Sequence, residues 1–179
     1  MPAAERQPSP RAGLVLRDEY RPAVTVRLGR HLRDRVLQPP QGIAACCRPG
    51  ERNHLYGNGA AGISASRLYA SSISDNYIED FNTSGITATV QNGAASVIMG
   101  NRIFKFSGHG TTFLNITQVN KGTGDLAVTG NVIRGTGTGT GLSYQRGAHQ
   151  LTVTSTGNLV QNVATPRKVG TGVTLSTGY

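Results

Sequence analysis

The sequence predicts an all-β fold, a solenoid of about five coils, preceded by an irregular or helical N-terminal segment. Two observations support this fold class. A glycine before an apolar or β-branched residue opens five strand-like runs, at Gly62, Gly85, Gly110, Gly141 and Gly172. Each interval contains an Asn that Ile or Val follows two residues later, at Asn76, Asn101, Asn131 and Asn158. The glycines are 23, 25, 31 and 31 residues apart, and repetition at such a period is typical of stacked coils.

Residues 1–53 differ in composition from residues 54–179, so we expect a separate basic segment before the solenoid. The first part holds seven of the eight prolines and ten Arg without any Lys. Within residues 22–37, apolar residues recur every four positions, which is typical of one face of a helix, and Pro39-Pro40 would end that helix. Three interpretations remain open: a cap on the end of the stack, a basic helix that binds a membrane or partner, or a misassigned start.

Each repeat of residues 54–179 divides into three short strands. In the second repeat, apolar and polar residues alternate over 86–90 and again over 95–99, and a third piece runs from Ile103 to near Phe106. Alternation with a period of two, interrupted by Gly and Asn, is typical of strands and turns. Three strands per repeat predict one coil of a parallel β-helix.

The recurring Asn has two expected roles. A tight corner needs a residue with positive φ, which Asn tolerates better than most residues. Coils stack about 4.8 Å apart, so Asn side chains at equivalent corners can form a hydrogen-bonded ladder. The following Ile or Val should point inward. The fifth residue after each Asn should add a mostly apolar stack, formed by Phe81, Phe106, Thr136 and Val163.

The glycine openings and Asn corners of residues 60–179 resemble those of the pectate-lyase-like superfamily of right-handed parallel β-helices. The resemblance implies a right-handed coil. Members include polysaccharide lyases, hydrolases, epimerases, phage tailspikes and surface adhesins, and many are exported. We therefore expect an extracellular or cell-surface location, although Gly13–Leu16 is too short an apolar run for a secretory signal.

The charge distribution argues against a nucleic-acid partner. The net charge of +9 divides into +5 for residues 1–53 and +4 for residues 54–179, and no zinc-finger or RNP-type motif is present. No apolar run reaches 18 residues, so no transmembrane helix is expected. Cys46 and Cys47 are adjacent, which suits neither a disulfide between them nor a zinc site.

Aligning the repeats on Asn predicts a charged cluster. The fourth residue after Asn reads Asp80, Lys105, Gly135 and Asn162 in successive repeats, and the third reads Glu79, Phe104, Arg134 and Gln161. Asp80 should thus lie beside Lys105. The resemblance implies that such carboxylates and cations could act on a uronate, with a Lys, Arg or His as the base. The candidate catalytic residues are Asp80, Lys105, His109 and Arg134. The alternative is a surface ion pair between coils.

Three further residues are candidates for substrate binding. Tyr77 and Tyr144 could stack against sugar rings, and Glu79 lies two residues from Tyr77. The alternative is that both tyrosines are solvated or lie at the edge of the core. The four histidines lack metal-ligand spacing. A Ca²⁺ site through Asp125 is possible in principle but not indicated, so no metal and no cofactor are expected.

Two functions follow from these observations. The first is a carbohydrate-directed secreted or cell-surface module without its own catalysis, as in an adhesin, tailspike or envelope protein. The alternative is a lyase- or epimerase-like enzyme acting on uronate polymers. The small number of charged residues in 54–179, eight Lys or Arg and four Asp or Glu, favours the first. The expected partner is a polysaccharide or glycan surface, and further coils of a longer chain are a second potential partner.

Overall fold

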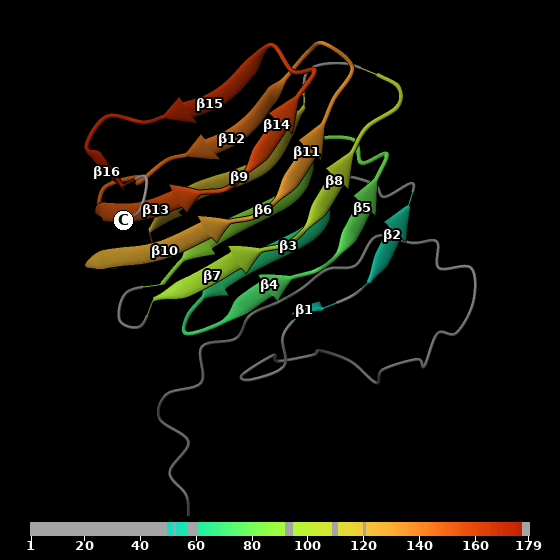
Figure 1. Cartoon of the computed structure of the whole chain (residues 1–179). Helices are drawn as coiled ribbons and strands as arrows, with labels where there is room; N and C mark the ends of the chain where they lie inside the picture. Colours follow the sequence, from blue (N-terminus) through green and yellow to red (C-terminus); the bar gives the residue numbers. More distant parts are fainter. Residues whose placement is uncertain are drawn as a thin grey trace, which may run out of the picture.

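The chain is wound into three parallel sheets that enclose one apolar core (Figure 1). The computed structural model describes residues 50–51, 53–56, 61–91, 95–108, 111–119 and 121–176. The helix predicted within residues 22–37 and the two cysteines lie outside these residues. All regular elements of the described chain are strands, which confirms the predicted all-β parallel solenoid.

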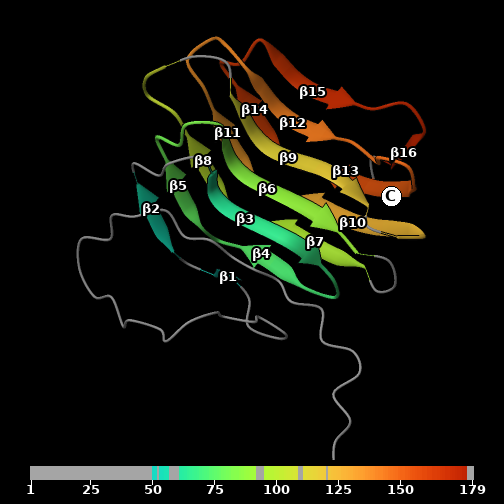
Figure 2. The ribbon, with the colours of Figure 1, turned by 180° about the vertical axis from the view of Figure 1, so that it is seen from behind.

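Each sheet takes every third strand of the chain. Sheet 1 contains β1 (Gly50–Glu51), β4 (Ser72–Ser74), β7 (Ser96–Met99), β10 (Thr123–Thr129), β13 (Gln150–Thr156) and β16 (Val173–Ser176). Sheet 2 contains β2 (His54–Tyr56), β5 (Tyr77–Glu79), β8 (Arg102–Phe104), β11 (Val132–Arg134) and β14 (Leu159–Gln161). Sheet 3 contains β3 (Ala61–Leu68), β6 (Ser84–Val90), β9 (Thr112–Val119), β12 (Thr140–Tyr144) and β15 (Thr165–Val169), and it faces the viewer in Figure 2.

The number of coils is slightly smaller than predicted. From β2 through β5, β8 and β11 to β14 the chain makes four turns, against the five expected. The strands β1 and β16 add part of a coil at the two ends, and β1 pairs with β4 in parallel. Every strand pairing in the described chain joins one coil to the next, so neighbouring coils are the unit of stability.

The predicted Asn ladder is confirmed, and it begins one coil earlier than expected, at Asn53. From Asn76 onward, the side-chain Oδ1 of each Asn accepts two hydrogen bonds from the preceding Asn. One comes from the backbone N–H of that Asn and the other from its Nδ2. The Nδ2 bonds join Asn53, Asn76, Asn101, Asn131 and Asn158 in turn at 3.0, 2.9, 2.9 and 2.9 Å. The three middle amides are at most 1% exposed, so the ladder satisfies polar groups that would otherwise be buried without partners.

The expected backbone reason for the Asn column is wrong. The Asn residues do not adopt positive φ; the residue before each one does. Asp75 has φ 56°, and the glycines at 100, 130 and 157 have φ between 63° and 65°. The left-handed residue therefore turns the corner, while Asn is required for its amide, which reaches both the neighbouring Asn and nearby carbonyl groups.

The second residue after each Asn points inward, as predicted. Ile78, Ile103 and Ile133 are in register across sheet 2 and are fully buried, and Val160 continues the column. Burying each such side chain contributes roughly 1.5–3 kcal/mol. This column forms one wall of the core, opposite inward residues of sheets 1 and 3.

The apolar stack expected at the fifth position is only partly present. Phe81 is buried and Val163 packs against the core, but Phe106 is 61% exposed. The corners differ: Asp80 and Asn162 adopt φ of 50° and 51°, whereas the corner after β8 takes its left-handed turn at Gly108. Where the fourth residue after Asn is left-handed, as Asp80 is, the fifth side chain turns inward. Lys105, the fourth residue of the next coil, is not left-handed, so its own side chain is buried and that of Phe106 is exposed.

The glycine openings are not all equivalent. Gly62, Gly85 and Gly141 share one column of sheet 3, where a Cβ would meet the inward Ile or Val of the adjacent sheet-2 strand and a carbonyl oxygen of the next coil. The register of β6 on β9 places Phe113 rather than Gly110 in this column. Gly172 lies in the turn before β16 of sheet 1 and has φ +73°. In the column of Gly62, Gly85 and Gly141, by contrast, close approach between sheets, and not a turn, requires glycine.

Candidate functional site

The outer face of sheet 2 carries the strongest candidate site. Each strand of this sheet has three residues with the middle one inward, so its first and third side chains point outward. On the first three coils most of these are aromatic. We call the aromatic stripe the set formed by His54, Tyr56, Tyr77, Phe104 and Phe106. Sheet 2 forms the right-hand side of Figure 1, where this face looks outward.

Four of the five rings of the aromatic stripe contact one another in a row. The His54 and Tyr77 ring centroids are 4.5 Å apart at 84°, and those of Tyr77 and Phe104 are 5.4 Å apart at 64°. Phe104 and Phe106 are 6.4 Å apart and tilted by 41°. Tyr56 and Phe106 are 52% and 61% exposed. His54, Tyr77, Phe104 and Phe106 thus form a continuous row of mostly edge-to-face ring contacts, and the exposed Tyr56 lies in register with Glu79.

Charged groups flank the aromatic stripe. Glu79 Oε2 lies 3.7 Å from His54 Nε2. Arg102 is in register with Tyr77, and Arg134 is in register with Phe104. The pKa of Tyr77 is raised, mainly by desolvation. Smaller contributions come from its hydrogen bond to the Glu79 carboxylate and from the negative charge of that carboxylate. The face therefore combines apolar ring surfaces with a carboxylate, a phenol and two guanidinium groups.

The predicted pair of Asp80 and Lys105 is not brought together. Their backbones are neighbours, since Asp80 N–H donates to Phe104 O at 3.2 Å. Asp80 Oδ1, however, accepts from Phe106 N–H at 3.1 Å. Lys105 turns inward, where its Nζ donates to Phe81 O and lies 5.2 Å from the centre of the Phe81 ring. With 8% exposure, Lys105 is positioned as a structural cation and not as an accessible base.

The other predicted residues fall in three different places. Glu79, Phe104 and Arg134 occupy one outward column, so Phe104 separates the carboxylate from the guanidinium group. Tyr144 is fully buried and its hydroxyl lies 3.0 Å from Ser155 Oγ, so its ring has no exposed face for a sugar. Burial raises its pKa. His109 lies outside the described residues.

The described residues contain neither a cluster of metal-ligating side chains nor a membrane-spanning helix. Among the described residues, no three His, Cys, Asp or Glu side chains gather closely enough to hold a metal ion. Asp125 is half-buried on the outer face of sheet 1, in register with Thr152. None of the described segments is a helix long and apolar enough to cross a membrane.

Of the five residues of the aromatic stripe, the sequence reasoning singled out only Tyr77 as a candidate binding residue. The signal was present, because the positions one and three after each Asn flank an inward Ile or Val. The first position reads His54, Tyr77, Arg102, Val132 and Leu159, and the third reads Tyr56, Glu79, Phe104, Arg134 and Gln161. Phe106 could not be found this way, because its outward position depends on the corner after β8.

The family comparison agrees with this architecture. The right-handed β-helix region family matches residues 43–179, and the chain belongs to that family. The match begins before the first described strand and covers all three sheets. No curated protein and no solved structure matches the chain.

Proposed function

We propose that this protein is a secreted or cell-surface β-helix module that binds a glycan on the outer face of sheet 2, without catalysis of its own. The observation that carries the proposal is the aromatic stripe, in which His54, Tyr77 and Phe104 supply one ring per coil. The rings of Tyr77 and Phe104 are half-buried and in mutual contact, and Phe106 beside them is exposed. Exposed apolar patches mark interaction surfaces.

The chemistry of the face suits a carbohydrate. Aromatic rings offer flat apolar surfaces on which the C–H face of a sugar can pack. Sugar hydroxyls need hydrogen-bond partners at the rim, which Glu79, Arg102 and Arg134 can supply. Successive coils repeat at about 4.8 Å, close to the length of one sugar residue in an extended polysaccharide. A glycan lying across the strands would meet one ring per residue.

The same geometry supports a binding role over a lyase or epimerase role. Proton abstraction from a uronate needs an accessible base beside a cation that stabilises the developing charge. Lys105 is turned into the core and Asp80 is engaged with a backbone N–H. On the outer face Glu79 contacts the His54 imidazole, and Phe104 separates Glu79 from Arg134.

The test is binding of the full chain to an array of neutral and uronate-containing polysaccharides. We expect retention on at least one glycan, and a loss of about fivefold in affinity for Phe104→Ala and for Phe106→Ala, since an aromatic contact contributes about 1 kcal/mol. Tyr69→Ala is the matched control, because Tyr69 is also exposed, at 39%, but lies outside sheet 2.

Two outcomes would overturn the proposal. One is that Tyr69→Ala weakens binding as much as the two Phe variants do. The other is the release of unsaturated product from a uronate polymer, followed by absorbance, at a rate that Lys105→Met abolishes. The second result would assign catalysis to the alternative function.

A further inference from the structure

Two arginines lie diagonally across the middle of the outer face of sheet 2. Arg102 begins β8 and Arg134 ends β11, and both side chains are exposed. Arg102 is in register with Val132. Arg134 is in register with Phe104, which follows Arg102 by two residues on β8. A strand spacing of about 4.8 Å and a rise of about 3.3 Å per residue place the two arginine Cα atoms about 8 Å apart, so both guanidinium groups can reach one ligand between them.

These two guanidinium groups are not neutralised within the fold. Neither has a hydrogen bond or an ion pair to any residue that the structure describes. Glu79 is the only acidic residue among the outward side chains of the described strands of sheet 2. Its carboxylate is shared between His54 and the hydroxyl of Tyr77. Two like charges at close range repel each other, so a bound anion would stabilise the arginine pair.

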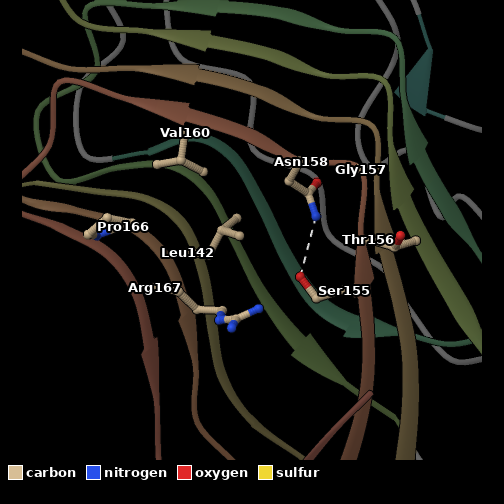
Figure 3. A pocket seen from close by; sticks show the side chains of 8 residues that line it. All are labelled: Leu142, Ser155, Thr156, Gly157, Asn158, Val160, Pro166 and Arg167. Carbon is tan, nitrogen blue, oxygen red and sulfur yellow. Dashed lines mark hydrogen bonds between the residues drawn. The ribbon is translucent and has the colours of Figure 1, made fainter. Parts of the chain in front are cut away.

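Other arginines of the described chain are placed differently. Arg146 donates from Nε and from Nη1 to backbone carbonyl groups, at 2.8 and 3.1 Å, and so holds a corner of the chain. Arg167 is in register with Leu142, in an inward column of sheet 3. Figure 3 shows it beside a hollow that Leu142 also lines. Arg102 and Arg134 differ from both in standing together on an outer sheet face without a described polar partner.

The arginine pair suits a phosphate or sulfate ester better than a carboxylate. A guanidinium group presents a planar fork of N–H donors that binds two oxygens of one anion. A phosphate or sulfate ester offers three terminal oxygens to two such forks, whereas a carboxylate offers two. A phosphate ester also carries a charge of about −1.5 to −2 at pH 7, which matches two cations. Phe104 and Val132 form the other diagonal of the patch and supply apolar surface for the group that carries the ester.

The surroundings of the patch favour a glycan over a peptide as the carrier. The strand β8 is paired with both β5 and β11, and β11 is paired with both β8 and β14. A peptide that adds to a sheet needs an open strand edge for its main-chain hydrogen bonds, and these two strands offer none. The patch is continuous with the aromatic stripe, because the ring centroids of Phe104 and Tyr77 are 5.4 Å apart. A ligand recognised by side chains alone, such as a sugar ring, fits this position.

We propose that Arg102 and Arg134 together bind a phosphate or sulfate ester of a glycan whose sugar ring packs on Phe104 and Val132. The inference rests on the proposed function of sheet 2 and adds the class of glycan that this face selects. Both strands have described neighbours on each side, so the site belongs to the interior of the stack. The two arginines determine specificity, and the aromatic rings supply affinity that does not depend on the anion.

The first test measures the anion alone. Inorganic phosphate is titrated into the full chain and its binding is followed by the width of its phosphorus NMR line. We expect broadening, and an affinity about tenfold weaker in Arg102→Gln and in Arg134→Gln, because each change removes one donor fork. Arg67→Gln is the matched control, since Arg67 is also exposed but lies on β3 of sheet 3. Equal losses in Arg67→Gln and Arg102→Gln would mean general charge attraction and would overturn the proposal.

The second test adds the sugar. Cellohexaose is compared by calorimetry with its phosphate ester, its sulfate ester and its uronate form, each modified at the primary hydroxyl groups. We expect the phosphate ester to bind about tenfold more tightly than cellohexaose, the sulfate ester to fall between them, and Arg134→Gln to remove the difference. The two esters thereby separate the two sources of the anion.

The possible failures are distinguishable. If neither ester binds more tightly than cellohexaose, the inference is overturned, while retention of other glycans on the array would leave the proposed function standing. If no glycan is retained although inorganic phosphate binds, the proposed function fails and the inference fails with it. Tighter binding of a phosphoserine peptide than of the phosphate ester would assign the arginine pair to a protein partner and overturn the inference.

Discussion

The inner and outer faces of sheet 2 are built from the same strands and follow opposite rules. On the inner face the column reads Ile78, Ile103 and Ile133, all fully buried. One residue earlier, on the outer face, the column reads Tyr77, Arg102 and Val132. The inner face repeats because each side chain must fill the same space in every coil. The outer face is free to differ, because no shared space fixes the same side chain there in every coil.

The largest expected loss of stability comes from removing a buried amide of the repeated Asn ladder. Asn101→Ala removes the acceptor of Asn76 N–H and Nδ2, and the donor to Ile73 O and Asn131 Oδ1. Several buried polar groups would lose partners at about 1–3 kcal/mol each. We expect a loss of roughly 3–5 kcal/mol in the free energy of unfolding, measured by urea titration.

Gln161→Ala is the matched change on the outer face, since Gln161 is an exposed amide of the same sheet. Its free energy of unfolding should change by less than about 0.5 kcal/mol. Comparable losses in the two variants would mean that the buried ladder is not a principal source of stability.

A smaller effect is expected where sheet 3 approaches sheet 2. In Gly85→Ala the new Cβ would overlap Ile103 Cγ2 and lie 2.7 Å from Phe113 O. Such overpacking costs about 1–3 kcal/mol. Gly130→Ala is the control: it has φ +63° but nothing within 4 Å of the added Cβ, so only backbone strain of about 1 kcal/mol applies. If Gly130→Ala proves the more destabilising of the two, positive φ and not close approach governs the glycine positions.

The smallest effect is a change in titration on the outer face. Because the pKa of Tyr77 is raised in the folded protein, its contribution to stability is present below about pH 10 and is lost as pH rises through the folded-state pKa. Glu79→Gln removes the carboxylate and should lower that pKa toward its ordinary value, although burial still raises it. Phenolate absorbance followed against pH measures the shift.

Tyr77→Phe identifies which phenol responds, since Tyr144 also has a raised pKa from burial. The absorbance change assigned to Tyr77 should be absent in this variant. A titration curve that is identical in the wild type and in Glu79→Gln would show that the carboxylate does not reach the phenol.

The candidate site was harder to predict than the fold. Counting from Asn places Glu79 and Arg134 in one column, which is outward in the structure because the short strands of sheet 2 keep a constant register. Lys105 and Tyr144 were misplaced for a shared reason. Lys and Tyr side chains are both amphipathic. The residue type alone therefore does not distinguish a surface Lys or Tyr from a buried one whose polar group has a hydrogen-bond partner.

Repetition in the sequence was enough to determine the all-β solenoid, the Asn ladder and the inward Ile column, because these depend on contacts that recur in every coil. The corners were decided only in the tertiary structure. A left-handed residue at Asp80 or at Gly108 changes which side chain enters the core, and that choice buried Lys105 and exposed Phe106. The position of Arg167 was likewise decided by the tertiary structure, because the register of β15 on β12 aligns it with Leu142 in an otherwise apolar column of sheet 3.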